Sequence, residues 1–333
     1  MSAVAILLPD ADSWPVPKDI MSYRPAVSCE VLSGSKPEDF DDAKLAGVIG
    51  LLWIPGTKVA ALADLFARCP SCRWIHTFSA GVDYVAAFIK GLPEHVQVSN
   101  GRGAFSSSLG EYVIAAALHF NKQVPRCLAN RAEGRWDKFV MPTLAGKTMG
   151  FLGFGSIGQT SARLAKAFGM RIIAVRRNAQ ADDEGSRLAD VTYSNEDAAQ
   201  MYAQSDFVVC TLPGTAATLD FVNAAAFKAM KSSAVFISLG RGAAVDEDAL
   251  VAALRAGPTQ PDGIAAAALD VFKVEPLPKE SPLWTCENLW LTAHNADFTD
   301  DYIELGWKVW RDNCEAAVAG KPLSTPVDKV AGY

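Results

Sequence analysis

Short apolar runs alternate with longer helical stretches along most of the chain. In the first hundred residues, the runs that predict strands cover 3–9, 47–55, 73–78 and 96–100. A second series of predicted strands covers 148–152, 171–175, 206–212, 234–239, 264–271 and 289–293. Because apolar strands that alternate with helices are typical of doubly wound parallel sheets, the pattern predicts an α/β protein.

Helical patterns lie between and around these strands. Residues 57–70 predict a helix in the first series, and Ser108 with Glu111 has the spacing of a capping box at the start of an Ala-rich helix. The stretch from Phe298 to Ala319 also has a helical pattern. With 333 residues the chain is longer than one hydrophobic core serves comfortably, so two domains are expected.

Composition and charge exclude some classes of partner. Of all residues, 50% are hydrophobic and 20% are charged, which is ordinary for a globular protein. The net charge of -6 argues against nucleic-acid binding, which requires a basic face. No apolar run approaches the roughly 18 to 20 residues that span a bilayer, so neither nucleic acid nor membrane is expected as a partner.

The start of the chain and its cysteines indicate a compartment. MSAVAILLPDAD has neither a cationic region nor a small-residue cleavage site, which favours a first strand over a signal peptide. The seven cysteines follow no disulfide framework, so reduced thiols in the cytoplasm are expected. Cys69 and Cys72 form a CxxC pair, for which two thiols in a turn and a redox centre are the alternatives. We expect no metal site.

A glycine-rich stretch follows the predicted strand 148–152. GFLGFGSIGQ carries the GxGxxG spacing and opens a helix predicted from about residue 157. Such glycines permit a tight turn and close backbone approach to a pyrophosphate, and the helix N-terminus offers N–H groups to that anion. Dinucleotide binding is therefore predicted, and a glycine-rich turn without a ligand is the alternative. The residues expected to contact the cofactor are Gly153, Gly155, Ser156, Ile157 and Gly158.

The next predicted strand ends in Arg176, Arg177 and Asn178. In NAD-binding folds an acidic residue at this position accepts hydrogen bonds from ribose hydroxyls. An arginine can instead make charge-assisted hydrogen bonds to the 2'-phosphate of NADP. We therefore expect NADP(H) to be preferred over NAD(H), with Arg177 and Asn178 completing the phosphate site. The alternative is that the arginines are solvated or paired with Asp182 or Asp183.

Arg241, Glu275 and His294 each follow a predicted strand of the second series. The carboxyl ends of parallel strands meet at one edge of a sheet, where open α/β sheets bind ligands. Glu275 beside His294 would stabilise the imidazolium, which could protonate a carbonyl oxygen as a hydride reaches the carbon. Arg241 could bind a carboxylate bidentately and polarise the carbonyl. The three residues together predict reduction of a 2-keto acid to a 2-hydroxy acid.

Seven motifs occur in order along nearly the full chain. They are SAGVD (79–83), GEYV (110–113), LAGKTMGFLGFGSIG (144–158), LPGTAAT (212–218), LGRGAAVDEDAL (239–250), ALDVFKVEPLP (268–278) and TAH (292–294). This set resembles the D-isomer-specific 2-hydroxyacid dehydrogenase family. The resemblance implies two doubly wound parallel-sheet domains: a flavodoxin-like substrate domain over 1–100 plus 297–333, and an inserted Rossmann cofactor domain over 101–296. It also implies a homodimer joined through the cofactor domain.

The resemblance assigns roles to individual residues. The family's catalytic arginine, glutamate and histidine correspond to Arg241, Glu275 and His294. The backbone N–H groups of Ala80 and Gly81 would bind the substrate carboxylate. Asp270 would bind the nicotinamide carboxamide, and a buried cap on the turn before Glu275 is the alternative. The same motifs add as cofactor residues Leu212, Pro213, Thr218, Leu239 and Gly240.

Departures from the family pattern bear on the substrate. They occur at Ser238, Gly214, Asn295 and Asp297. Asn295, Asp297 and Trp53 are expected to approach the substrate and to influence its choice. Arg176 and Arg177 make the NADP-linked glyoxylate/hydroxypyruvate reductase branch the nearest resemblance. Trp136 resembles a family tryptophan that reaches the active site of a neighbouring subunit, with an interface anchor as the alternative.

Two other functions are compatible with this scaffold. Formate-type dehydrogenases resemble the family but have glutamine at the position of Glu275, so that residue favours hydroxyacid chemistry. Corepressors use the fold as a dinucleotide-sensing interaction module, for which a peptide-binding cleft in the substrate domain and long tails are expected. The chain has almost no tail outside its predicted elements, which favours the enzyme.

Overall fold

A computed structural model of the chain describes residues 3–7 and 29–333. They form two compact units, which we call unit 1 (Met1–Phe105 with Asp300–Tyr333) and unit 2 (Ser106–Thr299). The sequence places the corresponding domain boundaries a few residues earlier, at 100 and 296. Each unit contains one parallel sheet, which confirms the predicted fold class.

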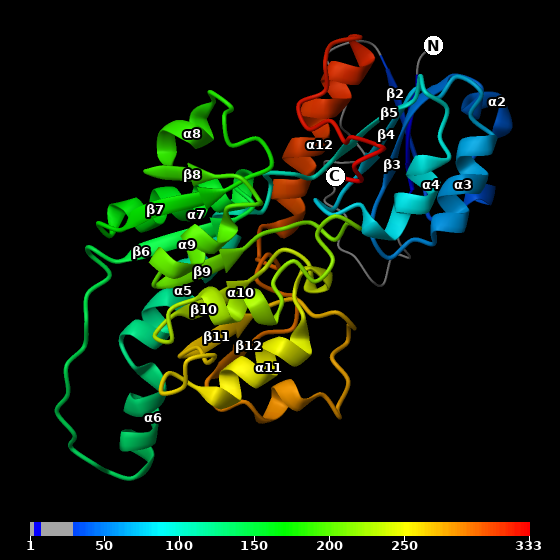
Figure 1. The fold of residues 1–333 in the computed structure, drawn as a ribbon. Coiled ribbons are helices and arrows are strands. Elements are labelled where there is room, and N and C mark those ends of the chain that lie inside the picture. The colour runs from blue at the N-terminus through cyan, green and yellow to red at the C-terminus, as the bar shows by residue number, and fades with distance from the viewer. Residues whose placement is uncertain (1–2, 8–28) are drawn as a thin grey trace. The chain divides into compact units, whose positions relative to one another are not determined.

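Unit 1 is built on a five-stranded parallel sheet with the order β2-β1-β3-β4-β5. Its strands are β1 (Ala3–Leu7), β2 (Glu30–Gly34), β3 (Val48–Trp53), β4 (Trp74–Thr77) and β5 (Gln97–Asn100). Its helices are α2 (Asp42–Leu45), α3 (Val59–Ala67), α4 (Ala86–Lys90) and α12 (Tyr302–Val318). Figure 1 shows α12 on one face of this sheet and α3 and α4 on the other. The strands β1, β3 and β4 are buried along their full length.

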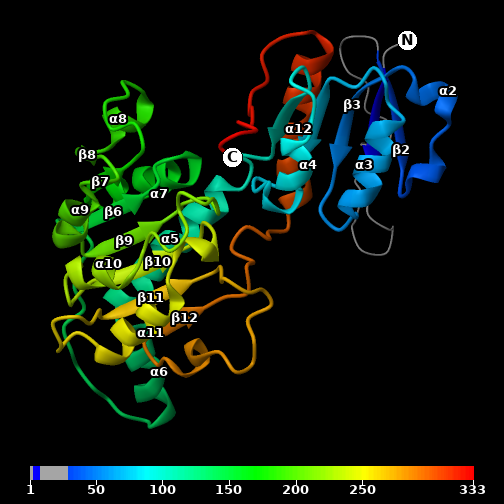
Figure 2. The ribbon, with the colours of Figure 1, turned by 45° about the vertical axis from the view of Figure 1, so that its right-hand side comes forward.

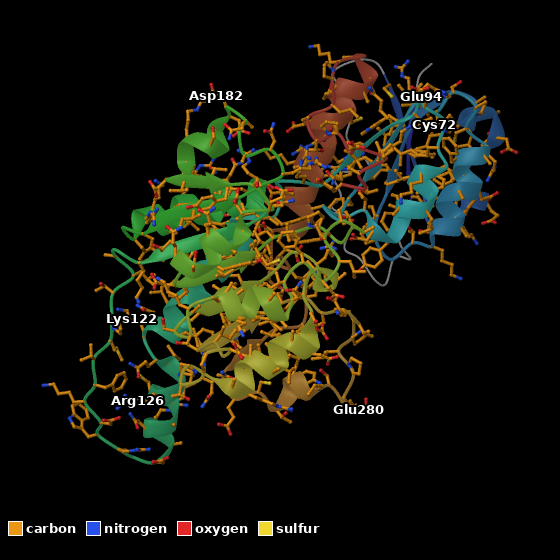
Figure 3. The ribbon with its side chains drawn as sticks, viewed as in Figure 1. Cys72, Glu94, Lys122, Arg126, Asp182 and Glu280 are labelled. Atoms are coloured by element: carbon orange, nitrogen blue, oxygen red, sulfur yellow. The ribbon has the colours of Figure 1, made fainter. Side chains whose placement is uncertain are left out.

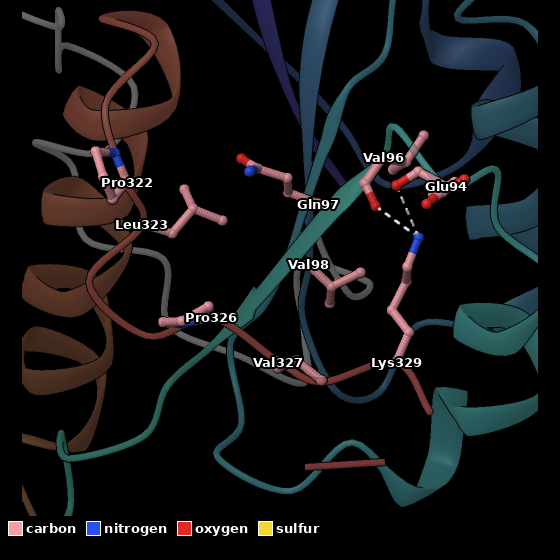
Figure 4. A pocket seen from close by; sticks show the side chains of 9 residues that line it. All are labelled: Glu94, Val96, Gln97, Val98, Pro322, Leu323, Pro326, Val327 and Lys329. Atoms are coloured by element: carbon pink, nitrogen blue, oxygen red, sulfur yellow. Dashed lines mark hydrogen bonds between the residues drawn. The ribbon is translucent and has the colours of Figure 1, made fainter. Parts of the chain in front are cut away.

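The C-terminal segment of unit 1 covers the free side of β5. The backbone N–H of Val327 donates to the carbonyl of Val98 at 2.9 Å, and that of Asn100 donates to the carbonyl of Thr325 at 3.2 Å. A groove of about 320 Å³ lies between this segment and β5 (Figure 4). Lys329 lies at its margin and donates through Nζ to the carbonyls of Pro93, at 2.9 Å, and Val96, at 3.1 Å.

Unit 2 is built on a seven-stranded parallel sheet with the order β12-β11-β10-β9-β6-β7-β8. Its strands are β6 (Thr148–Leu152), β7 (Arg171–Val175), β8 (Val191–Tyr193), β9 (Phe207–Cys210), β10 (Val235–Ser238), β11 (Ala266–Leu269) and β12 (Leu289–Leu291). Its helices are α5 (Ser106–Asn121), α6 (Val124–Ala132), α7 (Ser156–Ala167), α8 (Glu184–Leu188), α9 (Ala198–Gln204), α10 (Ala224–Ala229) and α11 (Glu247–Ala256). Figure 2 shows α10 and α11 side by side against this sheet.

The register of this sheet aligns the carboxyl ends of its strands. Leu152 at the end of β6 pairs with Val175 of β7 and with Cys210 of β9. Ser238 of β10 pairs with Cys210 and with Leu269 of β11, and β11 continues in register with β12. The residues that follow these strands therefore start from one level of the sheet, and they include the glycine-rich loop, Arg176 and the predicted catalytic residues.

Two strands and one helix start differ from the sequence-based expectations. The strands β2 and β8 were not predicted: β2 is partly exposed at every residue, and β8 has only three residues at the sheet edge. The helix α5 begins at Ser106, so the predicted capping box is wrong because Ser108 already lies inside the helix. Its hydroxyl instead donates to the carbonyl of Ala296. Residues 8–9 of the first predicted strand lie outside the described residues.

The extended segment 135–143, which we call the arm, connects α6 to β6 without regular secondary structure. It is attached to α6 by Arg126, whose guanidinium lies 4.1 Å from the centre of the Phe139 ring and 2.7 Å from the Asp137 carboxylate. Figure 3 labels Arg126 at this position. Trp136 is 98% exposed and Val140 is 81% exposed. The arm therefore presents large apolar side chains to its surroundings.

Cys69 and Cys72 are buried in the core of unit 1. Burial raises the pKa of the Cys69 thiol to about 11 and that of the Cys72 thiol to about 12. Because the thiolate is the reactive form of cysteine, this environment favours two packed thiols over a redox centre. Among residues 3–7 and 29–333, no helix is both long enough and apolar enough to cross a bilayer.

Candidate active site

The glycine-rich loop of unit 2 fits a dinucleotide pyrophosphate. Gly153 follows β6 with a φ of 80°, a left-handed conformation that favours glycine. A Cβ atom on Gly158 would lie 2.9 Å from the carbonyl oxygen of Gly153, whereas a Cβ on Gly155 would meet nothing within 4 Å. The space over Gly155 thus lies open at the start of α7. No side chain caps this helix, so its first N–H groups can bind an anion.

Two neighbouring turns approach this loop. A Cβ on Gly153 would lie 3.3 Å from Leu212, and a Cβ on Gly240 would lie 2.3 Å from the Leu212 carbonyl oxygen. The turn after β9, which carries Leu212, therefore packs closely against the glycine-rich loop and against the turn after β10, because neither Gly153 nor Gly240 has a side chain. The hydroxyl of Thr218 donates to the Pro213 carbonyl at 2.5 Å and so fixes its own turn. Leu239 is buried beside Gly240.

Arg176 lies directly after β7 and forms an ion pair with Asp183. Its Nη1 and Nη2 donate to the two carboxylate oxygens of Asp183 at 2.8 and 2.6 Å. This is one of the pairings that the sequence leaves open. The Arg176 guanidinium holds the pKa of the Asp183 carboxyl well below its usual range. Arg177 and Asn178 are both exposed.

Glu275 and His294 are in direct contact. The Nδ1 atom of His294 lies 2.6 Å from Oε2 of Glu275. The other carboxylate oxygen of Glu275 accepts from the backbone N–H of Phe272 at 2.9 Å, which fixes the carboxylate. Because Glu275 engages Nδ1, Nε2 is the ring nitrogen that remains for a reacting group.

Arg241 is brought to the same edge by a close contact between two loops. A Cβ on Gly242 would lie 1.9 Å from the backbone carbon of Phe272, so only glycine allows the loop after β10 to meet the loop that carries Glu275. Burial raises the pKa of the Asp297 carboxyl, and its electrostatic interactions with His294 and Arg241 oppose this rise. The edge therefore brings together a histidine, an arginine and two carboxylates.

Asp270 holds the backbone turn that carries His294. The φ of His294 is 51°, which is strained for a residue with a side chain. Its N–H donates to the Asp270 carbonyl at 2.8 Å, and the N–H groups of Asn295 and Ala296 donate to the two Asp270 carboxylate oxygens at 3.1 and 3.2 Å. Asp270 is thus a buried cap of the His294 turn, whereas the alternative from the sequence places the cap on the turn before Glu275. Its contact with the carboxamide stays a prediction.

A hydroxyl chain reaches Asp270 from two residues to which the sequence assigns no role. Thr292 Oγ1 lies 2.6 Å from Asp270 Oδ1 and 3.1 Å from the Tyr112 hydroxyl. Thr292 donates its one proton along the shorter contact, so Tyr112 donates to Thr292. Burial raises the pKa of the Tyr112 phenol, which keeps this donor protonated. Thr292 opens the TAH motif that ends in His294, and Tyr112 lies in the GEYV motif, so both motifs carry a signal although neither residue is given a role.

The predicted substrate residues of unit 1 lie in two places. Trp53 is buried in the core of the unit. Ala80 and Gly81 form a turn after β4, in which the Ala80 carbonyl accepts from Asn100 at 2.6 Å and the Gly81 carbonyl accepts from Ser79 at 2.8 Å. These bonds fix the turn through its carbonyls. The predicted substrate contacts of all three residues stay predictions.

Comparison with known proteins supports the resemblance found in the sequence. The family model described as D-isomer specific 2-hydroxyacid dehydrogenase, NAD binding domain, matches residues 114–296. The glyoxylate/hydroxypyruvate reductase B of Klebsiella pneumoniae is 34% identical over 256 residues, which cover 74% of this chain and 75% of that protein.

Solved structures share the fold over the full chain. An NADPH-dependent glyoxylate/hydroxypyruvate reductase from Sinorhizobium meliloti, in complex with NADP and sulfate, has a TM-score of 0.80 at 28% identity and covers 100% of both chains. A D-isomer specific 2-hydroxyacid dehydrogenase from Xanthobacter autotrophicus, in complex with NADPH and MES, has a TM-score of 0.81 at 28% identity and covers 100% of this chain and 99% of that one. The chain therefore belongs to the D-isomer-specific 2-hydroxyacid dehydrogenase family of NAD(P)-dependent oxidoreductases.

Proposed function

We propose that this enzyme uses NADPH to reduce a small 2-keto acid, such as glyoxylate or hydroxypyruvate, to the D-2-hydroxy acid. The observation that carries the proposal is the 2.6 Å contact between His294 Nδ1 and Glu275, at the same sheet edge as Arg241 and the glycine-rich loop. The names of the Klebsiella and Sinorhizobium relatives support this substrate class.

The proposal gives each residue of the site a task. When bound, a nicotinamide cofactor would supply the hydride that the carbonyl carbon of the substrate receives. His294 donates a proton from Nε2 to the carbonyl oxygen, and Glu275 stabilises the imidazolium that precedes this transfer. Arg241 binds the substrate carboxylate and polarises the carbonyl, because its guanidinium is a fixed positive donor group. The start of α7 binds the pyrophosphate of the cofactor.

The preference for NADPH over NADH is assigned to Arg176, with Arg177 and Asn178 beside it. Arg176 directly follows the last residue of β7, at the level of the glycine-rich loop. The N–H of Gly153 in that loop donates to the Val175 carbonyl at 3.1 Å. A 2'-phosphate would be held by charge-assisted hydrogen bonds at this position. The NADPH and NADP complexes of the two structural relatives support this assignment.

The enzyme is further proposed to act as a homodimer joined through unit 2. The exposed Trp136 and Val140 of the arm support this assembly, since large apolar side chains are commonly covered at interfaces. Trp136 either anchors that interface or reaches the partner's site.

A direct assay tests the proposed reaction. We expect NADPH oxidation, followed by the loss of NADPH absorbance, with glyoxylate or hydroxypyruvate and slower turnover with bulkier 2-keto acids. His294→Ala should remove most of the reduction and leave NADPH binding intact, because His294 lies outside the glycine-rich loop. Turnover retained by His294→Ala would overturn the proton donor. Tight NADPH binding without turnover of any 2-keto acid would favour the corepressor-like module.

A further inference from the structure

The guanidinium of Arg176 is already engaged by a carboxylate of its own chain. Nη1 and Nη2 donate to the two oxygens of Asp183 at 2.8 and 2.6 Å. The Arg176 side chain is only 17% exposed, whereas that of Asp183 is 43% exposed. The arginine that would meet a 2'-phosphate thus carries a built-in counter-charge.

Asp183 is itself fixed at the start of α8. Its Oδ1 accepts from the backbone N–H of Ser186 at 2.9 Å, and its own N–H donates to the Ser186 hydroxyl at 3.1 Å. These reciprocal bonds form a capping box. Because the carboxylate is held by the helix, it stays in place whether or not a phosphate approaches Arg176.

The space around Arg176 is shaped by a glycine. A Cβ on Gly185 would lie 3.2 Å from Arg176 Nη1 and 2.9 Å from Nε2 of Gln159. Gln159 belongs to α7, the helix that begins at the glycine-rich loop. The ion pair of Arg176 and Asp183 therefore lies against the cofactor-binding helix and not at a remote surface.

The ion pair leaves part of the guanidinium available. Arginine has five N–H groups in a plane, and the contact with Asp183 uses one on each Nη atom. The Nε–H and the outer Nη N–H groups can still donate to a phosphate. The carboxylate, however, cancels much of the positive charge that would attract a doubly charged anion.

We propose that Asp183 is a specificity-determining residue that limits how strongly the site prefers NADPH over NADH. It orients Arg176 and at the same time opposes the negative charge of the 2'-phosphate. NADH carries no phosphate at this position, so Asp183 leaves its affinity unchanged. This inference rests on the proposed role of Arg176 in NADPH binding.

The test compares cofactor affinities of Asp183 variants. Asp183→Asn and Asp183→Ser both keep a side chain that can cap α8, and both remove the negative charge. At low salt we expect NADPH to bind about fivefold more tightly, because the variants lose the Coulombic repulsion between the Asp183 carboxylate and a 2'-phosphate several ångströms away. NADH binding should stay within about twofold of the parent. High salt should shrink the gain, since ions screen the charge. Dissociation constants are measured by calorimetry on the full-length protein.

Asp182→Asn is the matched control. Asp182 is the neighbouring exposed carboxylate (Figure 3), and its removal deletes the same charge without breaking the ion pair. It should change NADPH affinity by less than the Asp183 variants do. An equal gain from both positions would overturn the specific role of Asp183.

Arg176→Ala separates this inference from the proposed function. It should weaken NADPH binding and leave NADH binding unchanged. If it changes neither cofactor, the assignment of Arg176 fails, and the inference fails with it. If Arg176→Ala behaves as expected but the Asp183 variants bind NADPH more weakly or unchanged, only the inference about Asp183 is overturned.

Discussion

The two ring nitrogens of His294 have different surroundings. Nδ1 is held by Glu275 at 2.6 Å, which leaves Nε2 for the proton transfer that we propose. The backbone of His294 is also unusual, because its φ of 51° lies in the left-handed region that residues with a side chain rarely adopt. The sequence predicts the pairing of histidine with glutamate, but this conformation depends on hydrogen bonds that Asp270 accepts from backbone N–H groups, and only the folded chain provides them.

His76 is the residue whose burial has the clearest consequence for stability. Its Nδ1 lies 2.7 Å from the Ser99 hydroxyl, and burial lowers its pKa to about 3. An unfolded histidine binds a proton near pH 6.5, so between these values the unfolded state binds more protons than the folded one. The free energy of unfolding should therefore be unaffected above about pH 6.5 and should fall below it, by at most about 1.4 kcal/mol per pH unit.

Urea unfolding of the parent and of His76→Asn, followed by tryptophan fluorescence at pH 7.5 and pH 5, measures this dependence. The variant should be less stable at both values but should lose less stability between them. Equal losses in the two proteins would contradict the assignment of the pH dependence to His76.

At the scale of elements, the strands that the sequence predicts best are those buried on both faces. Strands such as β6 and β9 are buried throughout, and a continuous apolar run marks them. β2 and β8 lie at sheet edges and are partly exposed, so they lack that signal.

The glycine spacing and the three strand ends were sufficient to predict candidate site residues. The pairing of Tyr112 with Thr292 joins positions 180 residues apart, and no local pattern encodes it.

The turn after β12 gives a prediction about positioning. Thr292→Val keeps the shape of the side chain but leaves Asp270 and Tyr112 without the hydroxyl between them. Asp270 keeps the N–H groups of Asn295 and Ala296, so the loss falls on the Tyr112 hydroxyl, and leaving such a buried group unpaired costs about 1–3 kcal/mol of stability. If the hydroxyl chain of Tyr112 and Thr292 holds the His294 turn for catalysis, kcat should fall about tenfold, the equivalent of about 1.4 kcal/mol. The KM for NADPH should stay within about twofold of the parent.

Steady-state kinetics with a 2-keto acid separate kcat from KM. Thr292→Ser retains the hydroxyl and should restore most of the parent kcat. An unchanged kcat in Thr292→Val would show that the hydroxyl chain has only a structural role.

At the scale of the whole molecule, the arm predicts an assembly. Trp136→Ala should shift a dimer toward monomer, because this side chain is almost fully exposed in one chain and aromatic side chains dominate interface energies. Sedimentation velocity at micromolar concentrations measures the distribution. Trp284→Ala is the matched control: it removes a second exposed tryptophan of unit 2 outside the arm and should leave the dimer intact. A parent protein that sediments as a monomer would contradict the proposed assembly.

The covering of β5 by the C-terminal segment has a consequence for biosynthesis. The ribosome synthesises unit 1 as two separate segments, and all of unit 2 is synthesised between them. Until residues 325–327 emerge, the Val98 carbonyl and the Asn100 N–H lack the partners that the finished fold gives them. Unit 2 can complete its sheet earlier, because its strands all precede residue 300. Unit 1 therefore completes its fold last, and the edge of β5 stays uncovered during the synthesis of most of the chain.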